Sequence, residues 1–414
     1  ANVKVITRDE IANSTSNNIP DVLSQIGGLN IRSTNGGQLN LDATVDMGGF
    51  GPTANSNTLV LVDGQRINPI DSGGVNWESI PMDSIERIEI LQGGASVQYG
   101  NGAVGGVINI ITNGNRTKLN QASITYGSFG TAIGNAIVRD SVDQTTYQLT
   151  ANTSNTQGWR QNSAANAYAI DGKLTQSFGG IDKIYTDLFY AYTNAQNPGG
   201  VVGQVGSGDP QAAKFNNIGS NSSTSNSGIR FGGTKEFLGT NIAELDGYYS
   251  NKSVFFNTPY YDSSSALAVG NYGSGNGNLN GWTLNLSPRV KSNFGRLGSA
   301  ILGYEFNQSN QSGENAYSPT TYAAMDAAGK ITNPNGLRQS TQSASILNQS
   351  IYGIGKIALL DSIDFSGGFR HQVQGATAND NSLTSNNGAL NGSQSYSANA
   401  GDIALNYSYL KNQK

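Results

Sequence analysis

The stretch from Tyr99 to Thr112, YGNGAVGGVINIIT, decides how the first quarter of the chain folds. Its glycines match the spacing G-x-G-x-x-G, which in dinucleotide-binding proteins opens a helix onto a pyrophosphate. Here the spacing leads into Val107-Ile108-Asn109-Ile110-Ile111, a β-branched run typical of a strand. No acidic residue stands about twenty positions further on, where a ribose would need one. We therefore predict a tight turn followed by a strand, and no nucleotide site.

The residues around this strand predict a compact, mixed α+β unit that spans residues 1–115. Asn18 is suited to cap a helix that has Pro20 in its first turn. Asp63-Gly64 is a strong hairpin signal at the end of a buried apolar run. Short strands are expected at residues 3–6, 59–62, 85–90 and 104–112.

From Lys118 onward the pattern changes to segments of about ten residues that alternate in polarity. Such segments, separated by turn-rich links, are the signature of a transmembrane β-barrel. We assign residues 116–414 to this second unit. Its twelve predicted strands are residues 119–126, 131–140, 145–153, 166–177, 183–194, 225–235, 242–255, 280–292, 297–308, 343–359, 363–374 and 395–409.

The links between these strands differ systematically in length. Short turns such as residues 179–182 and 237–240 alternate with long links such as residues 194–225 and 309–342. Outer-membrane barrels join their strands by short periplasmic turns and longer extracellular loops. A soluble β-sandwich has no reason to sort its links in this way, so the alternation favours the membrane barrel.

Composition supports the same class of protein. Of 414 residues, 54 are glycine, none is cysteine and only 13% are charged, compared with about 25% in ordinary soluble domains. The absence of cysteine excludes thiolate metal sites and cysteine nucleophiles. A net charge of −4 argues against nucleic acid as a partner. The one histidine, His371, cannot form a zinc site without further ligands, and we expect it in the lumen or at a membrane interface.

Three segments of the first unit resemble the plug domain of TonB-dependent outer-membrane receptors. Residues 59–68 (LVLVDGQRIN) resemble the family's LVLIDGVPLN, and Ile80-Pro81 with residues 85–91 resembles its IP…IERIEVL. Residues 99–112 resemble its YG…AGGVINIIT. The resemblance implies a plug inside a 22-stranded barrel in the outer membrane of a Gram-negative bacterium. It also implies import of a scarce ligand, energised by TonB and its inner-membrane complex.

The chain departs from the family in two motifs. Gln92 stands where the family's VLRGP has its arginine, which puts one plug–barrel ion pair in doubt. Met47-Gly48-Gly49-Phe50 stands in place of IRGF, again without the arginine. No TonB box precedes Val3, so we expect the coupling segment to lie outside this sequence.

The number of strands also departs from the family. Twelve strands ~4.8 Å apart and tilted ~40° close into a barrel of radius ~12 Å. A plug of 115 residues has a radius of gyration of about 13 Å and does not fit inside such a barrel. We therefore interpret the chain as part of a larger receptor, and we expect the first and last strands to remain unpaired with each other.

The resemblance also implies where a ligand binds. The upper loops of the plug should be residues 46–57 and 68–77, which are rich in glycine and asparagine. Such loops present backbone and amide donors, which suit a neutral or weakly charged chelate. The expected ligand contacts on the plug are Phe50, Arg66, Asn68, Asp71 and Trp77. Those on the long loops are Trp159, Tyr260, Tyr261 and Tyr317, each of which is equally well explained as an ordinary loop or interface residue. Glu86, Arg87 and Glu89 are expected to contact the barrel.

The sequence thus predicts a receptor that imports a ferric siderophore or another metal chelate, with cobalamin as the next candidate. The expected partners are TonB with its energising complex, the chelate and outer-membrane lipid, and no cofactor is expected. A passive porin or a surface adhesin is the alternative, although neither needs a plug. An outer-membrane protease or phospholipase is less consistent, because those barrels are small and no catalytic constellation is recognisable, so we expect no enzymatic activity.

Overall fold

The structure is a computed structural model of the 414-residue chain. It describes residues 2–33, 39–41, 43–69, 74–112, 118–199, 211, 219–261, 272–317, 338–360, 362–380 and 390–407.

The first unit, called the plug below, is a five-stranded mixed sheet with short helices, in the strand order β1-β6-β7-β4-β5. Strands β4 and β7 run parallel and the other neighbours antiparallel, while β2 and β3 form a separate two-stranded sheet. Its elements are β1 (Asn2–Thr7), α1 (Arg8–Ala12), α2 (Ile19–Ser24), β2 (Leu29–Arg32), β3 (Thr44–Met47), η1 (Gly51–Ser56), β4 (Thr58–Val62), β5 (Gln65–Arg66), η2 (Trp77–Ser79), η3 (Met82–Ser84), β6 (Arg87–Gln92), α3 (Ser96–Tyr99) and β7 (Gly106–Ile111).

Local sequence signals explain these short helices. The Asn18 side chain accepts a hydrogen bond from the Asp21 backbone N–H at 2.9 Å, which caps α2 as predicted. Helix α1 was not predicted, although Thr7 and Glu10 cap each other's backbone N–H groups in a capping box at its start. The apolar faces of both helices pack on the sheet, in a core that contains Leu23, Ile88 and Ile108.

The glycine-rich stretch adopts the predicted turn. Helix α3 precedes it and ends at Gly100, whose φ of +72° is costly for residues that carry a Cβ. Strand β7 then begins at Gly106. No helix starts at Gly102, so the geometry that a dinucleotide requires is absent from this segment.

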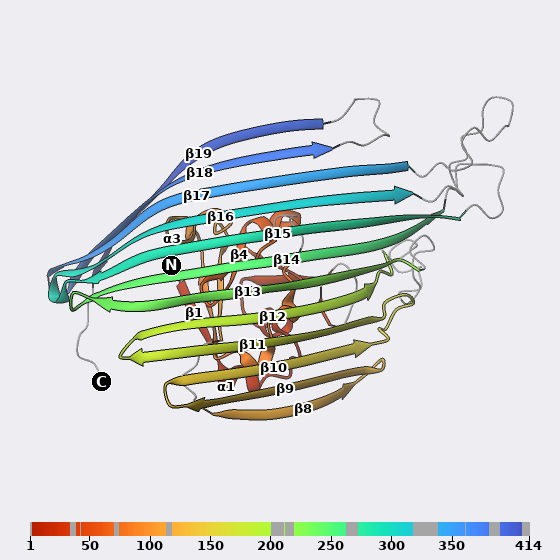
Figure 1. Cartoon of the computed structure of the whole chain (residues 1–414), viewed down its shortest axis with the longest axis horizontal. Helices are drawn as coiled ribbons and strands as arrows, with labels where there is room; N and C mark the ends of the chain where they lie inside the picture. Colours follow the sequence, from red (N-terminus) through yellow and green to blue (C-terminus); the bar gives the residue numbers. More distant parts are fainter. Residues whose placement is uncertain are drawn as a thin grey trace.

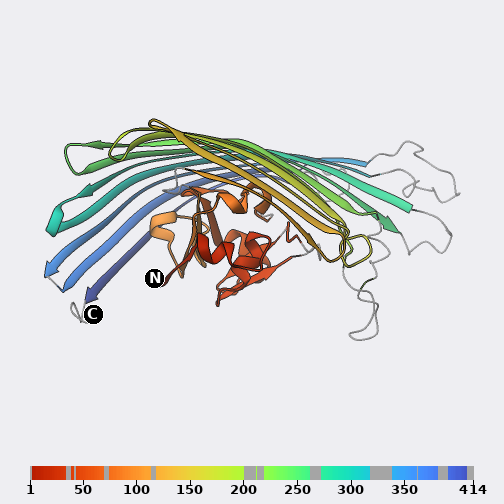
Figure 2. The same cartoon turned by 90° about the horizontal axis from the view of Figure 1, so that it is seen from below.

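The second unit is one antiparallel sheet of twelve strands in simple sequential order, from β8 at one edge to β19 at the other. Figure 1 shows these strands side by side, and Figure 2 shows that the sheet arches over the plug, which lies on its concave side. The strands are β8 (Leu119–Gly127), β9 (Thr131–Val142), β10 (Thr145–Thr156), β11 (Ala165–Gly179), β12 (Asp182–Gln196), β13 (Asn221–Phe237), β14 (Asn241–Tyr261), β15 (Tyr272–Asn293), β16 (Gly298–Tyr317), β17 (Arg338–Leu360), β18 (Ile363–Asp380) and β19 (Leu390–Tyr407), with the short helix η5 (Gly295–Leu297) between β15 and β16.

The twelve strands confirm the predicted number, and the wall they form is open. Among the described residues, β8 pairs only with β9 and β19 only with β18, so the two edges do not meet. The elements of the plug end at Ile111 and the wall begins at Leu119, on either side of the predicted boundary at residue 115.

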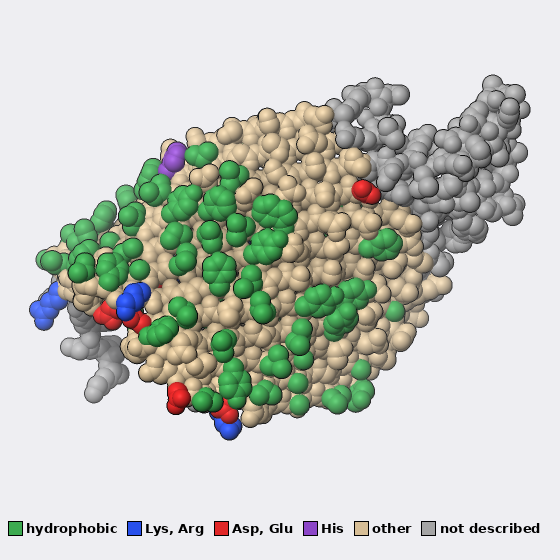
Figure 3. All heavy atoms as spheres, viewed as in Figure 1, with side chains coloured by type: hydrophobic (Ala, Val, Ile, Leu, Met, Phe, Trp, Pro, Cys, Tyr) green, Lys and Arg blue, Asp and Glu red, His purple; other side chains and the backbone are tan. Residues whose placement is uncertain are grey.

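The two faces of the wall differ in polarity because side chains alternate along each strand. In β12, Ile184 and Leu188 are more than half exposed on the convex face, whereas Asp187 is buried on the concave face. Figure 3 shows hydrophobic side chains spread over much of the convex face, with charged side chains near its edges. In the part of the chain that the structure describes, no helix combines the length and the apolar character needed to cross a membrane.

Candidate ligand-binding lumen

A buried ion pair joins the plug to strand β9. The Glu86 carboxylate lies 2.9 Å from the Arg139 guanidinium and 3.6 Å from that of Arg8. The Arg139 side chain is only 4% exposed and also donates to Gln148 on β10 at 2.7 Å. Because the guanidinium is surrounded by acceptors, its burial is compensated and it holds the plug to the wall.

A second buried pair joins the β4–β5 turn to strand β11. Positive φ angles at Asp63 and Gly64 form the predicted hairpin turn and direct the Asp63 carboxylate at the wall. There it lies 2.7 Å from Lys173 Nζ and accepts a 2.6 Å hydrogen bond from the Thr112 hydroxyl. Burial alone would raise the pKa of Asp63, but the Lys173 charge and these bonds hold it below its ordinary value.

On the opposite side, the plug meets strand β18 through hydrogen bonds, one of which runs from the buried Arg370 to the Gln98 carbonyl at 3.5 Å. The Arg370 guanidinium is paired with Glu305 and bonded to the Ser350 hydroxyl, both on the wall. It lies so close to Gly100 that any Cβ there would overlap it. Asn101 donates a weak hydrogen bond to Gln374 at 3.3 Å. Glycine at position 100 is thus required twice, by its φ angle and by this approach of the wall.

A pocket lies between the upper loop of the plug and strands β13 to β16, toward the ends of the strands that the long links join. Its cavity measures about 50 Å³. Both side-chain polar atoms of Asn76 and the amide oxygen of Asn226 are buried and have no hydrogen-bond partner within the described part of the chain. Unsatisfied buried amides are costly unless a ligand or water bonds them. The residues that line the pocket are Ile67, Asn68, Pro69, Gly74, Asn76, Asn226, Tyr248, Ser250, Lys252, Val254, Leu279, Gly281, Trp282, Thr283 and Gln311.

The predicted ligand contacts of the plug lie in different environments. Asn68 lines the pocket, but its amide accepts from Val60 N and donates to the Asn55 and Thr58 carbonyls, so it chiefly holds the loop together. Arg66 does not line this pocket. Its guanidinium donates to the carbonyls of Tyr99 and Asn101, at 3.1 and 2.5 Å.

Two further predicted contacts are tied into the plug itself. Trp77 is 4% exposed and its indole donates to the Ala43 carbonyl at 2.8 Å, so the structure gives it a role in the core instead of a ligand surface. Phe50 is half-buried, with its backbone N–H bonded to the Asp46 carboxylate. Asp71 lies outside the described residues.

The predicted loop aromatics are less closely defined. Trp159 is half-buried in the link between β10 and β11. The backbones of Tyr260 and Tyr261 end strand β14, and that of Tyr317 ends β16, but their side chains lie outside the described set. Their proposed contact with a ligand therefore stays a prediction.

Of the three predicted plug–barrel contacts, Glu86 reaches the wall as described. Arg87 and Glu89 instead pair with each other at 2.7 Å on the surface of β6, and Glu89 also accepts from Asn109. Gln92 bonds the Gly27 carbonyl within the plug at 2.9 Å. His371 bonds Asn399 on the neighbouring strand, and by the alternation along β18 its side chain lies on the convex face with those of Phe369 and Val373.

Glu78 was missed by the sequence analysis. It lies in η2 beside a small cavity at the plug–wall interface, where one carboxylate oxygen accepts from the Asn152 amide at 3.1 Å. Burial raises the pKa of Glu78 to about 7, and the Asn152 bond only partly opposes this shift. The described residues contain no group of three or more His, Cys, Asp or Glu side chains that could hold a metal ion.

Comparisons with known proteins agree with this architecture. Residues 1–107 match the family model described as the TonB-dependent Receptor Plug Domain. The chain is 37% identical over 124 residues to the ferric enterobactin receptor of Pseudomonas aeruginosa, a match that covers 27% of this chain and 16% of that protein. It is 34% identical over 143 residues to the vitamin B12 transporter BtuB of Vibrio cholerae, covering 33% of this chain and 23% of the relative. The resemblance to TonB-dependent receptors is thereby confirmed.

Solved structures share the fold of the whole chain. The unliganded ferric citrate transporter FecA superposes with a TM-score of 0.77 at 17% identity, over 99% of this chain and 61% of that one. The ferric yersiniabactin uptake receptor FyuA of Yersinia pestis gives a TM-score of 0.78 at 16% identity, over 99% and 62%. The chain thus spans about three-fifths of the length of these two structures.

The Asp63–Lys173 pair predicts a large effect on the stability of the plug. Lys173→Met leaves the Asp63 carboxylate buried without a counter-charge, and we expect the opening free energy of β4 and β7 to fall by about 3–5 kcal/mol. Hydrogen exchange of these amides in the full-length protein measures the change. Adding Asp63→Asn should restore part of the loss. Lys118→Met, which removes the exposed 3.3 Å pair with Asp140, is the control and should change little. Equal effects of the two lysine variants would contradict the assignment.

Glu78 predicts that the plug becomes less stable as the pH rises. Its folded pKa of about 7 lies above the ordinary value of 4.5, so its stabilising contribution is complete below about 4.5 and is lost as the pH rises to about 7. We expect Glu78→Gln to remove this pH dependence and to stabilise η2 by about 1–3 kcal/mol at pH 8. Hydrogen exchange at pH 5 and pH 8 tests this, with the exposed Glu236→Gln as the control. A pH response that persists in Glu78→Gln would exclude this carboxyl group as its origin.

Proposed function

We propose that this chain is part of a TonB-dependent outer-membrane receptor that imports a scarce metal chelate, with a ferric siderophore as the first candidate. The observation that carries the proposal is a plug held by ion pairs on the concave side of an amphipathic β-wall, with a pocket of unsatisfied amides above it. A passive porin needs an open lumen and an adhesin needs none, so neither explains the plug. The matched segments of relatives named as siderophore and vitamin B12 receptors support the same class.

The chemistry of the pocket supports a ligand that is neutral or weakly charged. Among the described residues that line it, the polar side chains are chiefly amides and hydroxyls, and Lys252 is the one that carries a charge. The apolar residues Leu279 and Val254 complete the lining. The cavity of about 50 Å³ is too small to enclose a chelate, so we propose that this surface supplies hydrogen bonds to one side of the ligand, with little need for a net charge on it. Cobalamin is the second candidate, because the match to a vitamin B12 transporter extends further along the chain, over 143 residues.

Import requires work, because the plug lies between the pocket and the opposite end of the lumen. Moving it breaks buried ion pairs and local structure, at a cost of several kcal/mol. The outer membrane holds neither ATP nor an ion gradient, so the work has to come from the inner membrane. TonB and its energising complex are the partners that this reasoning and the family of the plug imply. The short turns of the wall then face the periplasm.

Asn76 predicts a separation of binding from stability. Its buried amide has no partner among the described residues, so the plug of the Asn76→Ala variant should be as stable as the original or more stable. A ligand that bonds this amide should nevertheless bind about tenfold more weakly, a loss of ~1.4 kcal/mol. Competition binding of ferric siderophores and cobalamin to the full-length receptor measures the affinity. The exposed Asn13→Ala is the matched control. Unchanged affinity for every ligand that binds would remove Asn76 from the site.

Energised transport predicts that binding and uptake respond differently to TonB. We expect cells that carry the full-length receptor to bind the chelate with or without TonB, and to accumulate it only with TonB. Uptake of the labelled chelate in matched strains measures this, with surface binding at low temperature as the control. Equal accumulation in both strains would mean a passive channel, and the receptor assignment would fall.

A further inference from the structure

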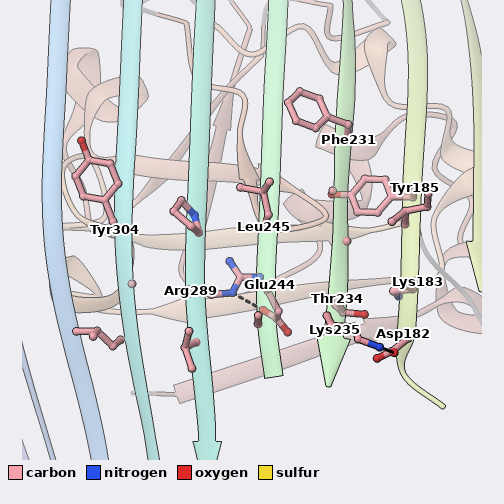
Figure 4. Close-up of a pocket in the computed structure, with 18 of the residues that line it drawn as sticks. Asp182, Lys183, Tyr185, Phe231, Thr234, Lys235, Glu244, Leu245, Arg289 and Tyr304 are labelled. Carbon is pink, nitrogen blue, oxygen red and sulfur yellow. Dashed lines mark hydrogen bonds and ion pairs between the residues drawn. The ribbon is translucent and has the colours of Figure 1, made fainter. Parts of the chain in front are cut away.

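The convex face of the wall carries a groove near its short-turn end, on the side away from the plug. Its cavity measures about 860 Å³ and extends across strands β11 to β17. Pockets of roughly 300–1,000 Å³ hold small organic ligands. The side chains of Ile184, Leu245 and Leu302 on its lining are 55%, 43% and 61% exposed, which places the groove on the outer face. Figure 4 shows Tyr304, Leu245 and Phe231 along three of its strands.

Glycine and proline residues create this depression in an otherwise regular wall. The Phe231 ring lies over Gly247, where a Cβ would overlap it, and so covers the neighbouring strand instead of projecting outward. Gly233, beside the exposed Ile184, adds no side chain to the lining. Pro288 has no N–H to donate, and the β15–β16 ladder pairs Leu286 with Phe306 and Arg289 with Gly303 but skips the residues between. The convex surface is therefore depressed at the groove, and large apolar side chains stand on either side of it.

Opposite charges lie at the rim of this apolar groove, at the end where the turns are short. Lys235 forms an ion pair with Asp182, which also accepts from the Glu236 backbone N–H at 2.7 Å (Figure 4). The Lys235 side chain is 72% exposed, whereas that of Asp182 is 17% exposed. The lysine can therefore reach a second anion without leaving the carboxylate. One cation and one anion side by side complement a headgroup that carries both charges.

We propose that the groove binds one zwitterionic phospholipid of the periplasmic leaflet. Its acyl chains lie against Phe231, Leu245 and Tyr304, its phosphate meets Lys235 and its ammonium group meets Asp182. From Lys235 to Phe231 the strand advances four residues, about 13 Å. With the strands tilted by ~40° this is a depth of about 10 Å, which lies within the ~15 Å hydrocarbon depth of one leaflet in a bilayer of ~30 Å. An anionic phospholipid fits less well, because Asp182 finds no cation on it. The proposal rests on the outer-membrane location given above and is independent of the imported ligand.

Native mass spectrometry of the full-length receptor, extracted from outer membranes in mild detergent, tests the proposal. We expect one phosphatidylethanolamine to be retained. Ala243→Trp, which fills the groove from the small residue on its floor, should lower this occupancy about tenfold. Ala151→Trp makes the same change on the exposed face of β10, outside the groove, and should leave the lipid in place. No retained phospholipid, or equal loss in both variants, would overturn the site.

The headgroup assignment needs its own variants. Lys235→Gln should weaken re-binding of phosphatidylethanolamine from mixed micelles about tenfold. Lys356→Gln removes a similar pair, 2.8 Å from Asp364 at the same end of the wall, and should have no effect because it does not line this groove. Phosphatidylglycerol or lipopolysaccharide bound equally well, or loss in both lysine variants, would refute the zwitterionic site. Chelate uptake and outer-membrane fractionation of the same variants report separately on the proposed transport function.

Discussion

The charges buried between plug and wall are the constraint on which the rest of this structure depends. Glu86 with Arg139, and Asp63 with Lys173, lie in a space from which water is largely excluded. A carboxylate or ammonium in such a space is tolerated only beside its counter-charge and with its other bonds satisfied. Each pair therefore fixes the position of the plug relative to the wall. Apolar packing is not directional and would not by itself define this position.

The same requirement explains why the concave face of the wall is polar. Along β12 and β13, Asp187 and Arg230 face the lumen and pair at 2.6 Å, while Leu188 and Ile229 point away from it. A one-residue shift in register would carry these charges to the convex face and the apolar side chains to the lumen. The ladder of backbone hydrogen bonds, the apolar outer surface and the charges that hold the plug thus all depend on one alternation of period two.

This dependence decides what could be predicted from the sequence. The hairpin at Asp63-Gly64, the cap at Asn18 and the strands of the wall follow from neighbouring residues, so local patterns were sufficient. That Arg139 faces the lumen could also have been inferred, because the apolar Val138 and Val142 take the opposite, lipid-facing side of β9 by alternation. Its pairing with Glu86, 53 residues away, depends on how the plug docks, and no local signal carries that information.

Candidate site residues were harder to predict for the same reason. The sequence pattern predicts Trp77 to be a loop aromatic, yet in the structure its side chain is buried in the core. The neighbouring Asn76 lies beside the pocket with its polar atoms unsatisfied. Whether a side chain supports the core or can bind a ligand therefore depends on where the fold places it, and not on the type of residue. The sequence preference of a loop for asparagine and glycine indicates where a ligand surface lies, but only the packing shows which amide faces it.

The attachment of the plug is uneven around the wall. Toward β9 and β11 it is held by buried ion pairs, each of which costs about 3–5 kcal/mol to break by removing one partner. Toward β15 to β18 a cavity of about 290 Å³ separates plug from wall, and the described plug–wall hydrogen bonds near it are long, from Arg370 to the Gln98 carbonyl at 3.5 Å and from Asn101 to Gln374 at 3.3 Å. An ordinary hydrogen bond contributes about 1 kcal/mol, and bonds as long as these two contribute less than a well-formed one. The buried ion pairs therefore make the attachment of the plug stronger toward β9 and β11 than toward β15 to β18.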